Sequence, residues 1–403
     1  MRRAGRAENA MRHGIAAGIT AVCVAAAGCT GGGAAPASRE EAAASHAAPH
    51  TAPHDSPRPR PSIPRVRSVD LVVWGPGGLP RSLGPVIRRT PGVELTSAIV
   101  AGVRWLRPAT GGDAVSSPRP PYEVPIVVAS VRPVSYAGFV SPADRAAIRD
   151  LGPGGALEAR TEVSLRNAGA GLHLFFDGDV HVDGAVSNAS TQGYELLTRA
   201  APPGWGDRFY LVRPASGART KLAARIRSSL PPGTLYRIRS RSETPYLRYA
   251  DAVPPQMAVK MAFGEFAAVR EPGGRLRVEP AWRARHIVAA RVPVLGRVTC
   301  NRALIPDLRA AMRDLQRQGL AHLVDSGDYE GCYSPRFIVS DPSAGISRHS
   351  WGAAVDLNAS ANPYGSPPHQ DRRLVEAMER HGFTWGGRWL RPDGMHFEWA
   401  GRR

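Results

Sequence analysis

The sequence contains almost no lysine. Lys221 and Lys260 are the only two among 52 basic residues, so the net charge of +18 at pH 7 comes almost entirely from arginine. A basic chain of this kind can bind nucleic acid, anionic lipid or an anionic cell-wall polymer. Because the sequence lacks helix-turn-helix, zinc-finger and RNA-recognition patterns, we predict that nucleic acid is not a partner.

Long apolar segments are also missing. Beyond the N-terminus no run reaches the roughly 18–20 residues of a membrane-spanning helix, which excludes a multi-pass membrane protein. Arginines at positions 2, 3, 6 and 12 precede the small apolar residues GIAAGITAVCVAAAG and then Cys29, an order typical of a signal peptide. The ending Ala26-Ala27-Gly28-Cys29 resembles a bacterial lipobox. We therefore predict export, lipidation of Cys29 and a lipid anchor in the membrane; a plain secretory signal and a retained anchor helix are the alternatives.

Cysteine is scarce, with four in the whole chain. Cys23 lies within the predicted signal peptide and Cys29 is the predicted lipidation site. Cys300 and Cys332 remain, an even pair in an oxidising compartment. A disulfide between them would close a loop of about 33 residues and contribute roughly 3–4 kcal/mol to stability. A metal site or a catalytic thiol would be the alternative, but no CxxC spacing supports either, and we predict the disulfide.

Composition divides the rest of the chain. Residues 30–67 are mostly Gly, Ala, Pro, Ser and His, so they cannot bury enough apolar surface to fold and are predicted to form a disordered tether. Patterned apolar residues begin near residue 68. We predict an α+β fold in four parts: a signal peptide with a lipobox-like end (1–29), the tether (30–67), an α+β domain of unknown role (68–275) and a separate C-terminal domain (276–403).

The domain at 68–275 shows two segments in the order strand, helix, strand. The first spans 69–100 and the second 209–240, which predicts two βαβ-like units, possibly an internal duplication. Between them the segment HLFFDGDVHVDG contains five residues that could bind a metal. Its alternation of apolar and polar residues instead predicts a hairpin with a DG turn. The five residues are His173, Asp177, Asp179, His181 and Asp183.

Two helices are predicted in the C-terminal domain. Apolar residues repeat at spacings of three and four over 304–315, with Pro306 in the first turn and Gly319 after the end. A second helix is predicted over 371–381. Both would pack on the strands that carry the candidate site.

The most informative stretch is SRHSWGAAVDLN, residues 347–358, followed some forty residues later by DGMHFE. His349, Asp356 and His396 make up two imidazoles and one carboxylate, a set that catalytic zinc accepts while keeping a fourth position for water. Asp393 could accept a proton from that water and return it to the leaving amine. Arg336 could hold the substrate carbonyl or its developing negative charge.

The pattern S-x-H-x-x-G-x-A-x-D with D-x-x-H-F-E resembles the family of zinc D-Ala-D-Ala carboxypeptidases and L-alanyl-D-glutamate peptidases, which shares its core with the hedgehog signalling domain. The resemblance covers about 330–400 and extends back to about 281. It implies that the two histidines and Asp356 bind Zn²⁺, that Asp393 is the acid/base, that Arg336 polarises the carbonyl and that the Ser347 hydroxyl supports the site. Many members of the family have Glu as the acid/base. The Asp at this position of the chain resembles the endolysin-like branch of the family instead.

Other residues near the motif have two interpretations each. Glu398 could orient a metal-binding histidine or could simply cap its strand. Trp351, Trp385 and Trp389 are predicted to pack in the core rather than to stack on a substrate. We interpret His369 and His381 as bystanders.

Taken together, the sequence predicts an exported, lipid-anchored zinc metallopeptidase facing the cell wall, with peptidoglycan stem peptides as substrate. It would act as a D,D-carboxypeptidase or as an endopeptidase of the L-Ala-D-Glu type. One alternative is a non-catalytic, zinc-containing module that binds the cell wall. Another is that the domain at 68–275 carries the main function of the protein. The sequence leaves open the bond that is cut, any protein partner and the oligomeric state.

Overall fold

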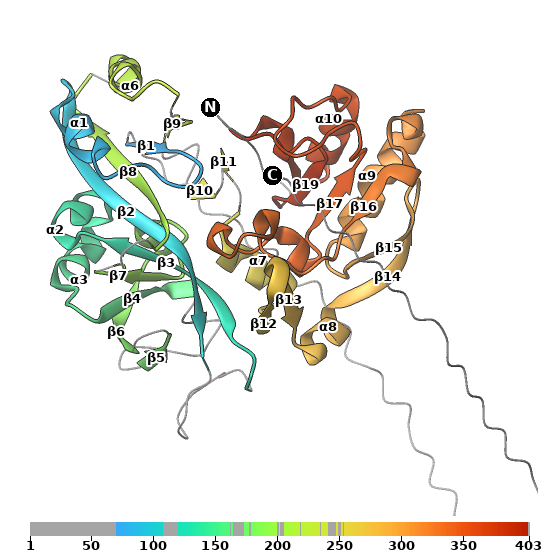
Figure 1. Ribbon diagram of the computed structural model, residues 1–403, viewed down its shortest axis with the longest axis horizontal. Coiled ribbons are helices and arrows are strands. Elements are labelled where there is room, and N and C mark those ends of the chain that lie inside the picture. Colours follow the sequence, from blue (N-terminus) through green and yellow to red (C-terminus); the bar gives the residue numbers. More distant parts are fainter. Residues whose placement is uncertain are drawn as a thin grey trace, which may run out of the picture. The chain divides into compact units, whose positions relative to one another are not determined.

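The computed structural model describes residues 70–107, 120–161, 163, 173–176, 179–199, 201, 205–217, 219–233, 235–240, 247–248, 251–252 and 254–401. The predicted signal peptide, the lipidation site Cys29 and the tether lie outside the described residues. Helices and strands are mixed throughout the described part (Figure 1), as predicted for an α+β protein. None of its helices is both long and apolar enough to cross a membrane.

A nine-stranded sheet forms the N-terminal half of the described chain. Its strand order is β5-β6-β4-β7-β3-β2-β8-β1-β9. The strands are β1 (Leu71–Trp74), β2 (Val93–Leu106), β3 (Val124–Val131), β4 (Gly155–Ala159), β5 (His173–Phe175), β6 (Asp179–Val186), β7 (Leu196–Thr198), β8 (Asp207–Pro214) and β9 (Arg237–Ser240).

The two predicted βαβ units are present and interlocked. Helix α1 (Leu83–Arg89) joins β1 to β2, and helix α6 (Arg219–Ser228) joins β8 to β9. Strand β8 lies between β1 and β2, and β1 lies between β8 and β9, with every neighbour antiparallel. This is the split βαβ arrangement of ferredoxin-like folds, with a long insertion between β2 and β8.

The insertion carries β3 to β7 and the short helices α2 (Pro133–Tyr136), α3 (Arg145–Asp150) and α5 (Asn188–Thr191). Strands β5 and β6 pair antiparallel, so the hairpin predicted at HLFFDGDVHVDG is confirmed, although Asp177 in its turn lies outside the described residues. Apolar side chains from both faces of the sheet are buried, among them Val72 and Leu211 on one face and Val73 and Val212 on the other.

The C-terminal half contains a four-stranded antiparallel sheet, ordered β16-β17-β19-β18, with helices and smaller β-pairs around it. Its elements are β10 (Leu247–Arg248), β11 (Asp251–Ala252), α7 (Gln256–Phe263), β12 (Ala268–Glu271), β13 (Arg275–Val278), α8 (Pro280–His286), β14 (Ile287–Val292), β15 (Gly296–Asn301), α9 (Ile305–Arg317), β16 (Tyr329–Gly331), β17 (Ala354–Leu357), α10 (Arg372–Arg380), β18 (Phe383–Trp385) and β19 (His396–Trp399).

Both predicted helices of this half are confirmed as α9 and α10. The apolar face of α9 is buried, and Pro306 lies in its first turn, where a missing backbone N–H costs nothing. The Asp371 side chain accepts a hydrogen bond from Arg373 N and caps the start of α10. The two helices contact each other, and their buried faces join one apolar cluster with the strands of the sheet.

The predicted disulfide between Cys300 and Cys332 is present, with the two Cα atoms 5.3 Å apart. It joins the end of β15 to the residue that follows β16, and both cysteines are buried. The apolar cluster around it begins at Val259 in α7 and runs to Trp399. The boundary near residue 275 stays a prediction.

Candidate metal centre

The candidate centre rests on two neighbouring strands. Strands β17 and β19 pair antiparallel with Asp356 directly opposite His396. Residues directly opposite each other project from the same face of a sheet, and their Cβ atoms lie about 4.5–5.5 Å apart. The register therefore brings the carboxylate and one imidazole together, although forty residues separate them in sequence.

The second imidazole comes from a short 3₁₀ turn, η8 (Arg348–Trp351), just before β17. The Ser347 hydroxyl accepts a hydrogen bond from His349 N and so begins the turn, which is the support predicted for Ser347. Gly352 ends it with φ of 62°, and a Cβ there would lie 2.6 Å from Asn301 N. Only glycine allows this turn to pass so close to β15.

The three side chains meet at a common point. His349 Nε2 lies 3.1 Å from Asp356 Oδ2, and His396 Nδ1 lies 3.0 Å from Asp356 Oδ1. The two ring nitrogens are 3.1 Å apart. Within the described part of the chain, only one group of three or more His, Cys, Asp or Glu residues has its possible metal-binding atoms all within 4.8 Å of one another. That group consists of these three side chains, and all three are buried.

This geometry fits a zinc ion. Two ligands of tetrahedral zinc, each bonded at about 2.05 Å, lie about 3.3 Å apart, close to the separations found here. The donor set of two neutral imidazoles and one carboxylate is one that zinc prefers, and it leaves a fourth position for water or substrate.

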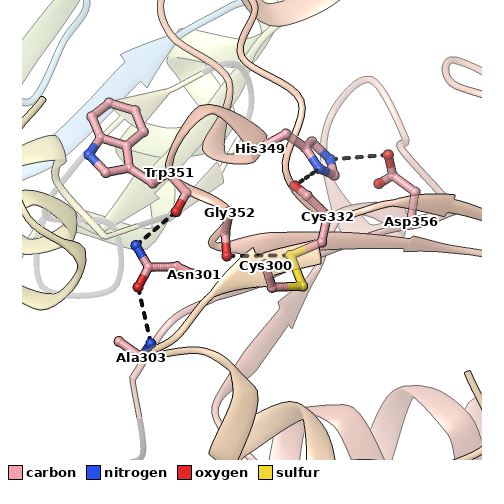
Figure 2. Close-up of a disulfide and its surroundings, with 8 residues drawn as sticks. All are labelled: Cys300, Asn301, Ala303, Cys332, His349, Trp351, Gly352 and Asp356. Atoms are coloured by element: carbon pink, nitrogen blue, oxygen red, sulfur yellow. Dashed lines mark hydrogen bonds and ion pairs between the residues drawn. A yellow bond between two sulfur atoms is a disulfide. The ribbon is translucent and has the colours of Figure 1, made fainter. Parts of the chain in front are cut away.

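Each imidazole is held by its other ring nitrogen. His349 Nδ1 lies 2.9 Å from the carbonyl oxygen of Cys332, whose side chain is in the disulfide (Figure 2). His396 Nε2 lies 3.2 Å from Glu398 Oε2. Partners of this kind fix which nitrogen faces the metal and raise its basicity. Glu398 thus contacts a histidine of the candidate centre, which agrees with the first of its two interpretations from sequence.

The charges of the site are strongly coupled. Burial by itself would raise the pKa of Asp356, but His349 and His396 outweigh it and hold that pKa well below its ordinary value. Burial would lower the pKa of His396, yet Asp356 and Glu398 raise it to about 10. A metal ion would displace the protons that these side chains share.

Asp393 and Arg336 flank the cluster. Both line the same cavity of about 150 Å³ as His349, Asp356 and His396. Asp393 Oδ1 is buried and has no hydrogen-bond partner among the described residues. Burial, chiefly, raises the pKa of its carboxyl. Arg336 Nη2 lies 4.0 Å from Asp356 Oδ2, with the side chain one-third exposed.

Sequence reasoning missed several supporting residues. The Ser350 hydroxyl donates to Arg336 O and accepts from Arg336 N, and so holds the backbone of that arginine. Arg348 is buried, with Nε 3.8 Å from Glu398 Oε1 and Nη2 donating to Pro254 O. The motif SRHSWG contains both residues, but neither spacing nor composition separates them from surface residues.

The remaining residues near the motif fall into two groups. Trp351 is fully buried, as predicted for a core residue. Trp389 lines the cavity, and its ring centroid lies 5.3 Å from that of His396. His381 contacts Asp314 on α9 and, like His369, does not line the cavity.

Comparison with solved structures gives weak likenesses. The periplasmic region of MacB from Actinobacillus actinomycetemcomitans is 12% identical, covers 43% of this chain and 89% of its own, and has a TM-score of 0.31. The extracellular domain of the ABC-type transporter YknZ from Gram-positive bacteria is 11% identical, covers 42% of this chain and 100% of its own, and has a TM-score of 0.30. At these TM-scores neither likeness supports an inference about this chain.

A family match falls on the candidate centre itself. The matched stretch contains His349, Asp356, Asp393 and His396, together with Ser347 and Glu398, whereas Arg336 and both cysteines precede it. Residues 340–399 of this chain match the family model described as D-alanyl-D-alanine carboxypeptidase.

Proposed function

We propose that the protein is a zinc metallopeptidase that hydrolyses peptide bonds in the stem peptides of peptidoglycan. One observation carries the proposal most directly. The half-buried Asp393, whose Oδ1 atom is buried and has no hydrogen-bond partner among the described residues, lies in the same cavity as a His-Asp-His donor set, within the stretch that matches the carboxypeptidase family.

The chain's own residues divide the chemistry between them. His349, Asp356 and His396 would hold the zinc ion, which when bound polarises a carbonyl and lowers the pKa of water. Asp393 takes the proton from the attacking water and gives it to the leaving amine. The Arg336 guanidinium binds the carbonyl oxygen as negative charge develops on it.

An extracytoplasmic location fits this substrate. The arginine-rich start, the apolar segment and Cys29 support export with a lipid anchor, and the disulfide between Cys300 and Cys332 is of a kind that persists in oxidising compartments. A tether of nearly forty residues would let an anchored enzyme reach an immobile polymer.

The experiment is mass spectrometry of peptidoglycan fragments after incubation with the purified protein. Asp393→Asn should lower the rate by about a hundredfold to ten-thousandfold, because a positioned acid/base contributes that much, while zinc stays bound. Chelation should abolish the activity, and zinc should restore it. Asp150→Asn, which removes an exposed carboxylate at the end of α3, is the matched control and should leave the rate unchanged.

The mass of the new fragment identifies which peptide bond of the stem is cut. Loss of one alanine identifies a D,D-carboxypeptidase, and release of the stem after L-alanine identifies an endopeptidase. If the folded, zinc-loaded protein binds stem peptides but yields no fragment, the peptidase assignment is wrong and the protein is a cell-wall binding module.

A further inference from the structure

A wide groove lies on one face of the nine-stranded sheet, away from the candidate metal centre. Its volume is about 1210 Å³, and it is lined by residues of α1, β2, β8 and the segments next to α2 and β7. Helix α1 packs on the face of the sheet that carries Tyr210, where Leu83 and Ile87 join one buried cluster with it. Among the described residues, no acidic side chain lines the groove, and five arginines do: Arg81, Arg88, Arg132, Arg199 and Arg208.

These arginines are not neutralised by the protein. Within the described part of the chain, none of the five forms an ion pair with a carboxylate. Arg213, on the same strand as Arg208, shows the contrast: its Nε lies 2.9 Å from Asp70 Oδ1. Five positive charges around one hollow repel each other, and this repulsion is relieved when an anion binds.

The groove has a floor that a chain-like ligand could lie on. Thr96, Ala98 and Val100 alternate along β2 and therefore face the same side of the sheet, where all three are half-buried. Thr96 Oγ1 is buried and lacks a hydrogen-bond partner among the described residues, so it can serve a ligand. Helix α1 and the segment before α2 form the charged walls.

Three of the arginines line the groove together with Tyr210 and act electrostatically on its hydroxyl. Burial raises the pKa of Tyr210, and the charges of Arg208, Arg132 and Arg81 act on it in the opposite direction. The Tyr210 hydroxyl donates to Pro80 O, 2.9 Å away, which fixes the ring next to the loop that carries Arg81. The positive charges thus converge from separate elements rather than lying along one exposed helix.

We propose that this groove binds a flexible, single-stranded polymer of the cell surface whose repeating charge is a phosphodiester. The planar guanidinium donates paired hydrogen bonds that match phosphate oxygens, and one charge per repeat lets a single chain contact arginines on separate elements. A concave site favours a flexible chain over a flat bilayer. The proposal rests here on the extracytoplasmic location given under the proposed function, with which the disulfide between Cys300 and Cys332 agrees and where cell-surface polymers supply such a chain.

Binding of fluorescently labelled poly(glycerol phosphate) to the full chain tests the proposal. Arg81→Glu with Arg88→Glu should weaken binding at least about tenfold, because each reversal replaces an attraction by a repulsion. Arg297→Glu with Arg313→Glu makes the same change of net charge on exposed residues of β15 and α9 and should weaken binding less than about threefold. The slope of log Kd against log salt should fall in the groove variant only.

Three further ligands decide the chemical class: poly-glutamate, a DNA duplex and phosphatidylglycerol vesicles. Circular dichroism checks each variant, and Arg132→Glu with Arg199→Glu replaces the first pair if that pair does not fold. An equal loss in groove and control variants would show that net charge alone binds the polymer and would overturn the proposal. So would a failure of poly(glycerol phosphate) to bind, or binding of any of the three other ligands that is as tight and equally sensitive to the groove variant.

Discussion

At the scale of single residues, the hydrogen-bond partners of the histidine ring nitrogens distinguish this centre from a chance cluster. His396 has a carboxylate at each ring nitrogen, Asp356 at Nδ1 and Glu398 at Nε2. Glu398 is fully buried and has the Arg348 guanidinium on its other oxygen. Arg348 also lies next to His349 in sequence, so a single buried arginine connects the segments of both imidazoles.

We predict that Arg348→Met weakens zinc binding by about tenfold to a hundredfold, because loss of a residue that orients a metal-binding side chain has that effect. Competition with a fluorescent chelator measures it. Arg348→Lys keeps the positive charge beside Glu398 and should recover part of the affinity. If both variants fold and bind zinc as tightly as the unaltered protein, Arg348 has no positioning role.

At the scale of elements, the disulfide and the pair of helices α9 and α10 hold the strands of the site. The disulfide fixes Cys332, whose carbonyl oxygen holds His349 Nδ1. On the other side of the core, Asp314 of α9 accepts hydrogen bonds from Arg380 at the end of α10, with the Nη2–Oδ2 distance 3.0 Å. Each link joins segments that are distant in sequence.

Replacing both Cys300 and Cys332 by Ala should lower the free energy of unfolding by about 2–4 kcal/mol, because the unfolded chain regains the freedom of a loop with a sequence separation of 32. Urea denaturation measures the loss. Zinc affinity should fall as well, since the carbonyl behind His349 is no longer fixed. A stability unchanged within about 0.5 kcal/mol would contradict the prediction.

Asp314 should make folding sensitive to acid. Burial acts to raise the pKa of its carboxyl, but Arg380 and other donors outweigh burial and lower the pKa to about 2. A carboxyl with a lowered folded-state pKa stabilises the fold above its ordinary pKa, and this stability is lost as the pH falls through the folded value.

The cost of Asp314→Asn should therefore be constant above about pH 4 and should vanish toward pH 2. It should not exceed about 1 kcal/mol, because Arg380 is half exposed and solvent screens the pair. Thermal unfolding of both proteins across this range measures the difference. If the stability difference between the two proteins grew as the pH fell, the pKa of Asp314 would be raised on folding and not lowered.

At the scale of the whole molecule, helix α7 connects the large sheet to the metal centre. Lys260 on α7 forms a buried ion pair with Glu195, at 2.7 Å, just before β7. Gln256 on the same helix donates to Pro125 O in β3, at 2.9 Å. At the ends of the helix, Arg348 donates to Pro254 O and Trp351 Nε1 donates to Gly264 O.

Lys260→Ala should lower the free energy of unfolding by about 3–5 kcal/mol, because it leaves the Glu195 carboxylate buried without this partner. Lys221→Ala is the matched control: it removes the only other lysine, which is exposed on α6. Chemical denaturation of both variants checks the prediction. Equal stabilities would show that the ion pair between the sheet and α7 contributes nothing to folding.

The grouping of His349, Asp356 and His396, the disulfide and the order of the main elements could be predicted from the sequence, whereas the acid/base role of Asp393 stays a prediction. The reason is that they depend on local patterns. Strand and helix periods, turn residues and the spacing of His and Asp in two short motifs are all readable within a dozen residues. The two βαβ units and the hairpin of β5 and β6 followed from the same periods.

Only the tertiary structure decided which nitrogen of each histidine faces Asp356 and which residues Glu398, Arg348 and Ser350 contact. Each of these depends on atoms that are far apart in the chain and are brought together by strand register and packing. The arginine groove has the same origin: its charges come from separate elements with no shared motif, and only the fold of the sheet shows that they line one hollow without a neutralising carboxylate.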